Sequence, residues 1–336
     1  MRYYQILLLL LFLMPTAARS DCAFPWPQGT FLQVYDSHLT KDSDGWRHDI
    51  SRWKSLGVEE LVLQWSAYGS PEGEAFPIIE SGTLRRLLDA AEAAAVKLRI
   101  GLRYDPGFWD HHAHDESSFG GQASQAPSDL VNYLFRRGRD QQALIAALAP
   151  LALHPAFGGW YISDEIDDLR WRSLSRRQLL NDYLAKLVDI LKEVTPSASI
   201  AISAFSNGLL APLELAEFLE EVTTNNGIDQ LFFQDGIGAR KLEMSELGYY
   251  IPVLSKKFQD SPASFTLIVE LFETSPADDG FLPASAERIE EQLLHAATSG
   301  GAPFTFSLSH HADPRAGEAA GLLARELKQL KQKCGL

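Results

Sequence analysis

The sequence is poor in cysteine, because only Cys22 and Cys334 occur among its 336 residues. One lies near each end of the chain, so a bridge between them requires a fold that brings the first and last elements together, as a closed barrel does. In an oxidising compartment we expect this disulfide to form, and the alternative is two free thiols on frayed ends. A bridged pair would leave no cysteine to act as a nucleophile.

Several familiar motifs are also missing from the sequence. No Gly-rich turn follows the first predicted strand, which argues against a dinucleotide site. The pattern Gly-x-Ser-x-Gly does not occur, so hydrolysis by a Ser-His-Asp triad has little support. No segment after the N-terminus is long and apolar enough to cross a membrane, and we expect no membrane span in the mature protein.

Positive charge is scarce as well. The chain has 30 Lys and Arg residues against 44 Asp and Glu residues, which gives a formal net charge of -14. An acidic surface of this size argues against nucleic acid or anionic membranes as partners. It is compatible with a neutral or cationic substrate.

The N-terminus has the pattern of a secretory signal peptide over residues 1–20. Arg2 precedes an apolar run from residue 6 to residue 14, and the small-residue site Ala18-Arg19-Ser20 follows. Cleavage before Asp21 would remove two arginines and no acid, which changes the formal charge from -14 to about -16. We therefore expect a secreted protein, located in the periplasm.

The remaining residues, 21–336, alternate between strand-like and helix-like segments without a linker. The predicted strands are 30–35, 60–65, 98–104, 157–167, 199–205, 230–235, 265–270 and 304–309. The predicted helices lie around 46–56, 84–95, 143–148, 175–194, 213–222, 243–257, 285–300 and 316–330, and a long loop covers 105–139. Eight βα units in one series predict an α/β protein with a single (β/α)8 TIM barrel, in preference to an open doubly wound sheet.

In such a barrel, the residues at the C-terminal ends of the strands face one mouth. Carboxylates, amides and aromatic rings dominate these ends, and such groups bind sugar hydroxyls and stack on sugar rings, whereas a phosphate ester would need a basic cradle. The candidate substrate-binding residues are Gln33, Tyr35, Gln64, Trp65, Arg103, Tyr104, Asp164, Asn207, Gln234, Asp235, Glu273 and His310. We expect a polysaccharide or oligosaccharide substrate and a monomeric protein.

Two acids among the strand ends could form a catalytic pair. Glu165 at the fourth strand and Glu270 at the seventh would face each other across the mouth, as glycoside hydrolysis requires of its proton donor and its nucleophile or base. Asp164 with Glu270, or Glu165 with Glu273, are alternative pairs. Glu270 could instead be a structural acid paired with Arg103, and the acids of 164–167 could simply open the next helix.

Three motifs carry a resemblance to a known family: Gly-Trp-Tyr-Ile-Ser-Asp-Glu-Ile-Asp at 159–167, Phe-Gln-Asp-Gly-Ile-Gly at 233–238 and Val-Glu-Leu-Phe at 269–272. They look like a bacterial family of secreted, glycosidase-like barrels catalogued mainly as a domain of unknown function, over roughly residues 30–309. This family is similar to the clan of retaining (β/α)8 glycoside hydrolases. The resemblance implies that Glu165 is the acid/base, that Glu270 is the nucleophile, and that the substrate is an exopolysaccharide.

One position departs from the pattern of that clan. The residue before the acid/base is usually Asn, which binds the sugar 2-hydroxyl, whereas here it is Asp164. An adjacent carboxylate could raise the pKa of Glu165, which would suit an acid catalyst. The departure also supports a second hypothesis, a non-catalytic carbohydrate-binding barrel that assists polysaccharide assembly or export.

The long loop after the third strand holds Trp109, a candidate stacking platform, and the histidine-rich segment 111–115. A metal-dependent hydrolase using this segment is a third, weaker hypothesis, because the spacing matches no zinc motif such as H-E-x-x-H. We expect neither a metal nor another cofactor. A loop of this length beside an active site is often a lid or a substrate subsite.

Overall fold

The structure of the protein is a computed structural model that describes residues 22–69, 79–110, 128–275, 277 and 280–336. The predicted signal peptide and the segment 111–115 lie outside the described residues. Within the described ranges, no helix combines the length and the apolarity that a bilayer crossing needs.

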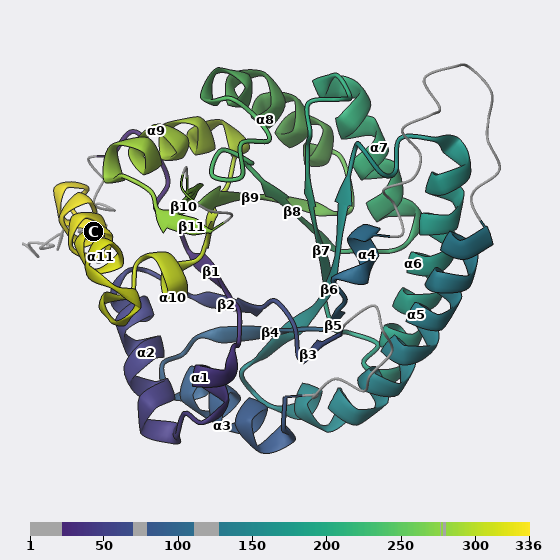
Figure 1. Cartoon of the computed structure of the whole chain (residues 1–336), viewed down its shortest axis with the longest axis horizontal. Coiled ribbons are helices and arrows are strands. Elements are labelled where there is room, and N and C mark those ends of the chain that lie inside the picture. Colours follow the sequence, from purple (N-terminus) through teal and green to yellow (C-terminus); the bar gives the residue numbers. More distant parts are fainter. Residues whose placement is uncertain (1–21, 70–78, 111–127, 276, 278–279) are drawn as a thin grey trace, which may run out of the picture.

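The described strands form a closed barrel of eight parallel strands in the order β1-β12-β9-β8-β7-β6-β4-β2 (Figure 1). Its members are β1 (Gly29–Leu32), β2 (Glu60–Leu63), β4 (Lys97–Gly101), β6 (Phe157–Asp167), β7 (Ile200–Phe205), β8 (Gln230–Gln234), β9 (Ser264–Glu270) and β12 (Phe304–Phe306). Gly29 of β1 pairs with Phe304 of β12, which closes the ring. The predicted (β/α)8 fold is confirmed.

A ring of helices surrounds the barrel (Figure 1). It consists of α2 (Ser43–Ser55), α3 (Ser81–Ala93), α5 (Ser128–Leu148), α6 (Leu174–Val194), α7 (Pro212–Asn225), α8 (Met244–Gln259), α9 (Ala286–Ala296) and α11 (Glu318–Lys333). Ser285 is the N-cap of α9, because its hydroxyl accepts a hydrogen bond from the Arg288 amide at 3.2 Å.

Shorter elements follow the C-terminal ends of several strands. The short helices are α1 (Asp36–Leu39), α4 (Gly107–Asp110) and α10 (Leu308–His311), and the small sheets are β3 (Ala67–Tyr68) with β5 (Arg103–Tyr104) and β10 (Phe272–Thr274) with β11 (Phe281–Pro283). Since strand ends of a barrel share one mouth, these elements lie around that mouth.

The barrel has two apolar cores. The larger lies between the strands and the helices, and the smaller fills the barrel interior. The interior core consists of Phe31, Val62, Tyr161, Ala201, Phe232, Ile268 and Phe304, with Phe306 packed against it. Because both faces of each strand are covered, the strands read as near-continuous apolar runs in the sequence.

Helix α5 corrects one prediction. The sequence suggested a short helix over 143–148 after a long loop, whereas α5 begins at Ser128. Its buried face includes Arg137 and Gln141, which are 2% and 0% exposed, so a polar pair interrupts the apolar stripe that helix prediction relies on.

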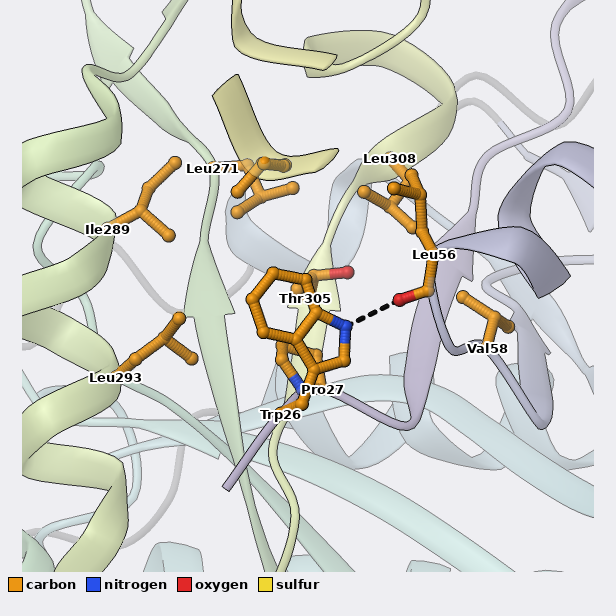
Figure 2. Close-up of a pocket in the computed structure, with 10 residues that line it drawn as sticks. Trp26, Pro27, Leu56, Val58, Leu271, Ile289, Leu293, Thr305 and Leu308 are labelled. Carbon is orange, nitrogen blue, oxygen red and sulfur yellow. Dashed lines mark hydrogen bonds between the residues drawn. The ribbon is translucent and has the colours of Figure 1, made fainter. Parts of the chain in front are cut away.

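The first and last described segments of the chain meet beside the barrel. Cys22 and Cys334 form the predicted disulfide, with their Cα atoms 4.8 Å apart. Next to this end of the chain, the Trp26 indole donates a hydrogen bond to the Leu56 carbonyl and borders an apolar cavity of about 20 Å³ between the barrel and α9 (Figure 2). The lining is almost entirely apolar, so we expect this cavity to stay dry.

Candidate active site

The tip of β6 places Glu165 inside the barrel mouth. Ile162 pairs with Ile202 and Ile166 pairs with Ala204, so three residues of β6 lie opposite the single residue Ser203 of β7. Such an irregularity re-aims the side chains between the paired positions and is common beside active sites. Glu165 lies in this irregular segment.

The Glu165 carboxylate is held by two side chains from the neighbouring strands. Its Oε1 accepts a hydrogen bond from Gln234 Nε2 of β8 at 2.8 Å and a longer one from Ser203 Oγ of β7 at 3.5 Å. The pKa of Glu165 is raised to about 7, mainly by burial and to a smaller extent by the charge of Asp167, while the two hydrogen bonds act in the opposite direction. Glu165 is therefore close to half-protonated at neutral pH.

Glu270 ends β9 on the inner face of the barrel. Ile268, two residues earlier, belongs to the interior core, so the alternation of the strand turns Glu270 toward the same lumen. Its Oε2 accepts a hydrogen bond from the Ala239 amide at 2.9 Å. Burial, followed by the nearby charge of Asp235, raises the pKa of Glu270 to about 8, and the side chain is only 1% exposed.

The contact between Ala239 and Glu270 depends on a glycine. A Cβ atom at Gly238 would lie 2.1 Å from the Phe272 carbonyl and 3.0 Å from Glu270 Oε2. Only a residue without a side chain therefore lets this loop approach the end of β9 and present its amide to the carboxylate.

Asp235 is not positioned as a ligand contact, contrary to the prediction. It is fully buried, and its carboxylate accepts hydrogen bonds from Gln292 Nε2 of α9, from the Ile237 amide at 3.2 Å and from the Glu270 amide at 3.4 Å. Burial raises its pKa to about 7. Asp235 thus holds the backbone of Glu270 from behind the strand.

Asp164 also faces away from the mouth, which corrects its assignment as a substrate-binding residue. Its Oδ1 is ion-paired with Arg137 Nη2 of α5 at 2.7 Å, and its Oδ2 accepts a hydrogen bond from the Tyr183 hydroxyl of α6 at 2.6 Å. Its side chain is 2% exposed. Its charge raises the pKa of Glu165 less than burial and Asp167 do.

Amides and aromatic rings predicted from the ends of β1, β2, β4 and β12 do come together. Gln33 Nε2 donates to Gln64 Oε1 at 2.7 Å, and the Tyr35 hydroxyl donates to Gln33 Oε1 at 3.0 Å. The ring centroid of Tyr35 lies 5.8 Å from that of Trp65 and 5.1 Å from that of His310.

The same cluster extends to two further tyrosines. The centroid of the Trp65 ring lies 5.3 Å from that of Tyr104 and 5.5 Å from that of Tyr68. Tyr35 and Tyr68 are 47% and 41% exposed, so their rings offer stacking surfaces at the mouth.

Three further residues predicted to bind substrate, Arg103, Asn207 and Glu273, are not in this aromatic cluster. Arg103 is ion-paired with Asp140 of α5 at 3.1 Å. The Asn207 side chain and amide are held by Asp168, and its Oδ1 accepts from Lys241 Nζ at 3.0 Å. Glu273 is exposed on β10.

The metal hypothesis and the stacking role of Trp109 stay untested. The side chain of Trp109 in α4 and the segment 111–115 lie outside the described residues. Among the side chains that the structure does describe, no group of three or more His, Cys, Asp or Glu residues is arranged to hold a metal ion.

Several residues that shape the site were not identified from the sequence. Ser203 and the Ala239 amide contact the two acids, and Arg137 and Gln292 hold the acids behind them. Ser203 had a detectable signal, because it occupies an inward position of β7 two residues after the core residue Ala201. Arg137 and Gln292 lie far from the strand ends in the sequence, and Ala239, shortly after β8, contributes only its backbone amide.

The fold is shared with solved glycosidases. A putative alpha-L-fucosidase from Bacteroides thetaiotaomicron VPI-5482 is 20% identical, with a TM-score of 0.70 over 91% of this chain and 95% of that chain. A beta-galactosidase from the psychrophilic Marinomonas ef1 is 13% identical, with a TM-score of 0.57 over 91% of this chain and 59% of that chain. A beta-mannanase from the blue mussel Mytilus edulis is 14% identical, with a TM-score of 0.50 over 92% of each chain. At these identities the likeness establishes the barrel fold alone.

The sequence has a nearer relative in Escherichia coli K12, the "Uncharacterized protein YbcH". The two are 32% identical over 272 residues, which cover 81% of this chain and 83% of that protein. Residues 28–317 match the family described as "Domain of unknown function (DUF4434)". Because this match covers most of its length, the chain belongs to the DUF4434 family.

Proposed function

We propose that this protein is a secreted glycoside hydrolase that cleaves a polysaccharide by a retaining mechanism, with Glu165 as acid/base and Glu270 as nucleophile. The observation that carries the proposal is the pair of inward carboxyl groups at the ends of β6 and β9, both with a pKa raised by burial. Two such groups on opposite sides of a glycosidic bond are the minimum that this chemistry needs.

The contacts of each acid suit its role. Gln234 donates to Glu165 Oε1, which leaves Oε2 to carry the proton that passes to the leaving oxygen. The Ala239 amide donates to Glu270 Oε2, which stabilises the ionised form that attacks the anomeric carbon. Water then cleaves the glycosyl–enzyme bond while Glu165 removes its proton.

A carbohydrate substrate is supported by the aromatic and amide cluster at the mouth and by the names of the solved proteins that share the fold. We assign an exopolysaccharide as the substrate on the family resemblance. A periplasmic location is supported by the N-terminal pattern and by the disulfide between Cys22 and Cys334. N-terminal sequencing of the mature protein, expected to begin at Asp21, tests secretion.

The decisive experiment is covalent trapping. The protein is incubated with cyclophellitol-type epoxides of gluco, galacto and manno configuration, followed by intact-mass and peptide mass spectrometry. A single adduct on the peptide that contains Glu270, absent from Glu270→Gln, supports the mechanism. Adducts on another residue, or inverted anomeric configuration of the first product by NMR, would contradict it.

One observation favours the second candidate function, a non-catalytic carbohydrate-binding barrel. Glu270 is 1% exposed and has a pKa of about 8, so in the free protein it is mostly a neutral acid at pH 7 and could donate a hydrogen bond to a sugar. In that case Glu165→Gln and Glu270→Gln would bind oligosaccharides like the wild type, and the wild type would release no reducing ends.

A further inference from the structure

A groove runs outward from the barrel mouth between the β10–β11 hairpin and the turn that leads into α11. Its volume is about 500 Å³, within the range of small-molecule sites. Its walls include Tyr35, Phe272, Phe281, Leu282, Phe306 and His310. We call it the hairpin groove.

The hairpin groove begins beside the proposed nucleophile. Phe306 pairs with Glu270 in the register of β12 and β9, and Phe272 lies two residues after Glu270. Tyr35 and Gln33, members of the amide and aromatic cluster at the mouth, also line the groove. A saccharide whose scissile bond lies at Glu270 would therefore continue into this groove.

One wall of the groove is aromatic. The Phe272 ring lies 4.5 Å from Phe281, 6.1 Å from Phe306 and 5.3 Å from His311 between centroids. At the lip, Phe281 and Leu282 are 56% and 45% exposed, so the hairpin holds an apolar surface in contact with water. An exposed ring at the edge of the groove provides a stacking platform for the apolar face of a sugar.

The groove offers little charge to a ligand. Glu318 is the one acid and no Lys or Arg is present among its lining residues. Burial lowers the pKa of His310 and, to about 4, that of His311, so both rings are neutral at pH 7. A uronic acid would find no cation here and would meet Glu318 and a chain of net charge -14.

We propose that the hairpin groove is a subsite for an uncharged sugar residue of the substrate chain, which stacks on Phe281. This inference rests on the proposed function, because it places the groove next to the bond that Glu165 and Glu270 cleave. It adds the substrate class: a neutral saccharide at least two residues long, in preference to a polyuronate.

The test measures binding in the Glu165→Gln protein, so that cleavage does not interfere. The probes are neutral hexaoses of β-1,4-glucan, β-1,3-glucan, β-1,4-mannan and β-1,6-N-acetylglucosamine, with hexagalacturonate and hexamannuronate as anionic probes, followed by calorimetry. We expect at least one neutral hexaose to bind and neither uronate to do so.

The groove itself is tested by Phe281→Ala, with Phe135→Ala as the matched control, because Phe135 is 72% exposed on α5. Phe281→Ala should weaken binding of the hexaose about tenfold. Phe281→Tyr, which keeps an aromatic ring, and Phe135→Ala should each leave the affinity within about twofold of the protein with Phe281. Retained binding in Phe281→Tyr together with lost binding in Phe281→Ala distinguishes a stacking role of the ring from damage to the hairpin.

Equal binding by Phe281→Ala and Phe135→Ala, tighter binding of a uronate, or no binding of any hexaose would overturn the subsite. Catalysis is scored separately by reducing-end release in the wild type. Ring-dependent binding without such release would contradict the proposed hydrolase and leave the subsite standing.

Discussion

The buried acids on the outer and inner faces of the barrel tip have different partners. On the outer face, Asp164 is ion-paired with Arg137 and hydrogen-bonded to Tyr183. On the inner face, Glu165 and Glu270 receive hydrogen bonds from an amide side chain, a hydroxyl and a backbone amide, and no ion pair to either occurs among the described residues. Burial without a paired cation raises the pKa of Glu165 to about 7 and that of Glu270 to about 8. The inner acids can therefore exchange protons, while Asp164 holds two helices against β6.

The largest difference between the faces should appear in the reaction rate. Glu165→Gln or Glu270→Gln should lower kcat/KM about a thousandfold or more on the neutral hexaose that binds, because each removes a group that acts on the reacting bond. Glu217→Gln, an exposed acid of α7, is the control and should change it less than about twofold. Equal losses in all three variants would contradict the assignment.

Substitutions on the outer face should instead change the free energy of unfolding. Arg137→Met leaves Asp164 buried without its cation and should lower the free energy of unfolding by about 3–5 kcal/mol. Arg139→Met, 71% exposed on the same helix, should change it by less than about 0.5 kcal/mol. Urea unfolding measures both. If the two variants unfold alike, Arg137 does not anchor the tip of β6.

Glu270→Gln should stabilise the protein at alkaline pH. The folded-state pKa of Glu270, about 8, lies above the ordinary value of 4.5, so its contribution to stability is intact below about pH 4.5 and is lost as the pH rises to about 8. The variant avoids this loss and should be more stable at pH 8.5 by on the order of 3 kcal/mol. Urea unfolding at pH 4.5 and 8.5 measures the difference, which should shrink at the lower pH. A stability difference between the variant and the wild type that does not depend on pH would contradict the raised pKa of Glu270.

The smallest effect concerns the pH dependence of the rate. The proposed mechanism needs Glu165 protonated and Glu270 ionised. With pKa values of about 7 and about 8 this is the minor singly protonated form, and it is most abundant between about pH 7 and 8, so kcat/KM should peak there and fall about tenfold per unit on either side. Gln234→Leu removes a hydrogen bond that lowers the pKa of Glu165, so the limb near pH 7 should move upward. A profile with no limb between pH 6 and 9 would contradict the assigned pair.

The order of strands and the inner acids could be predicted from the sequence because they depend on short-range patterns. Eight apolar runs alternated with helical stripes, and Glu165 and Glu270 stood at the ends of two of them. The disulfide followed from the same prediction, since a closed barrel brings Cys22 and Cys334 together.

The orientation of neighbouring side chains could not be predicted in the same way. Asp164 and Asp235 stood at strand ends like the true inner residues, yet both turn outward, and the irregular pairing of β6 is invisible in a sequence. The start of α5 was missed because the partner of Asp164, Arg137, interrupts the apolar face of that helix. The errors at Asp164 and at the start of α5 share one cause, the buried ion pair between Asp164 and Arg137, whereas Asp235 faces Gln292 of α9.

The bridge between Cys22 and Cys334 spans 312 residues and turns nearly the whole folded chain into a covalent ring. A single cut in any surface loop of a ring yields one linear molecule instead of two pieces. The strands on both sides of such a cut would stay tethered, and the barrel could close again without a search for its missing half. The disulfide would therefore keep the chain in one piece after a single proteolytic cut.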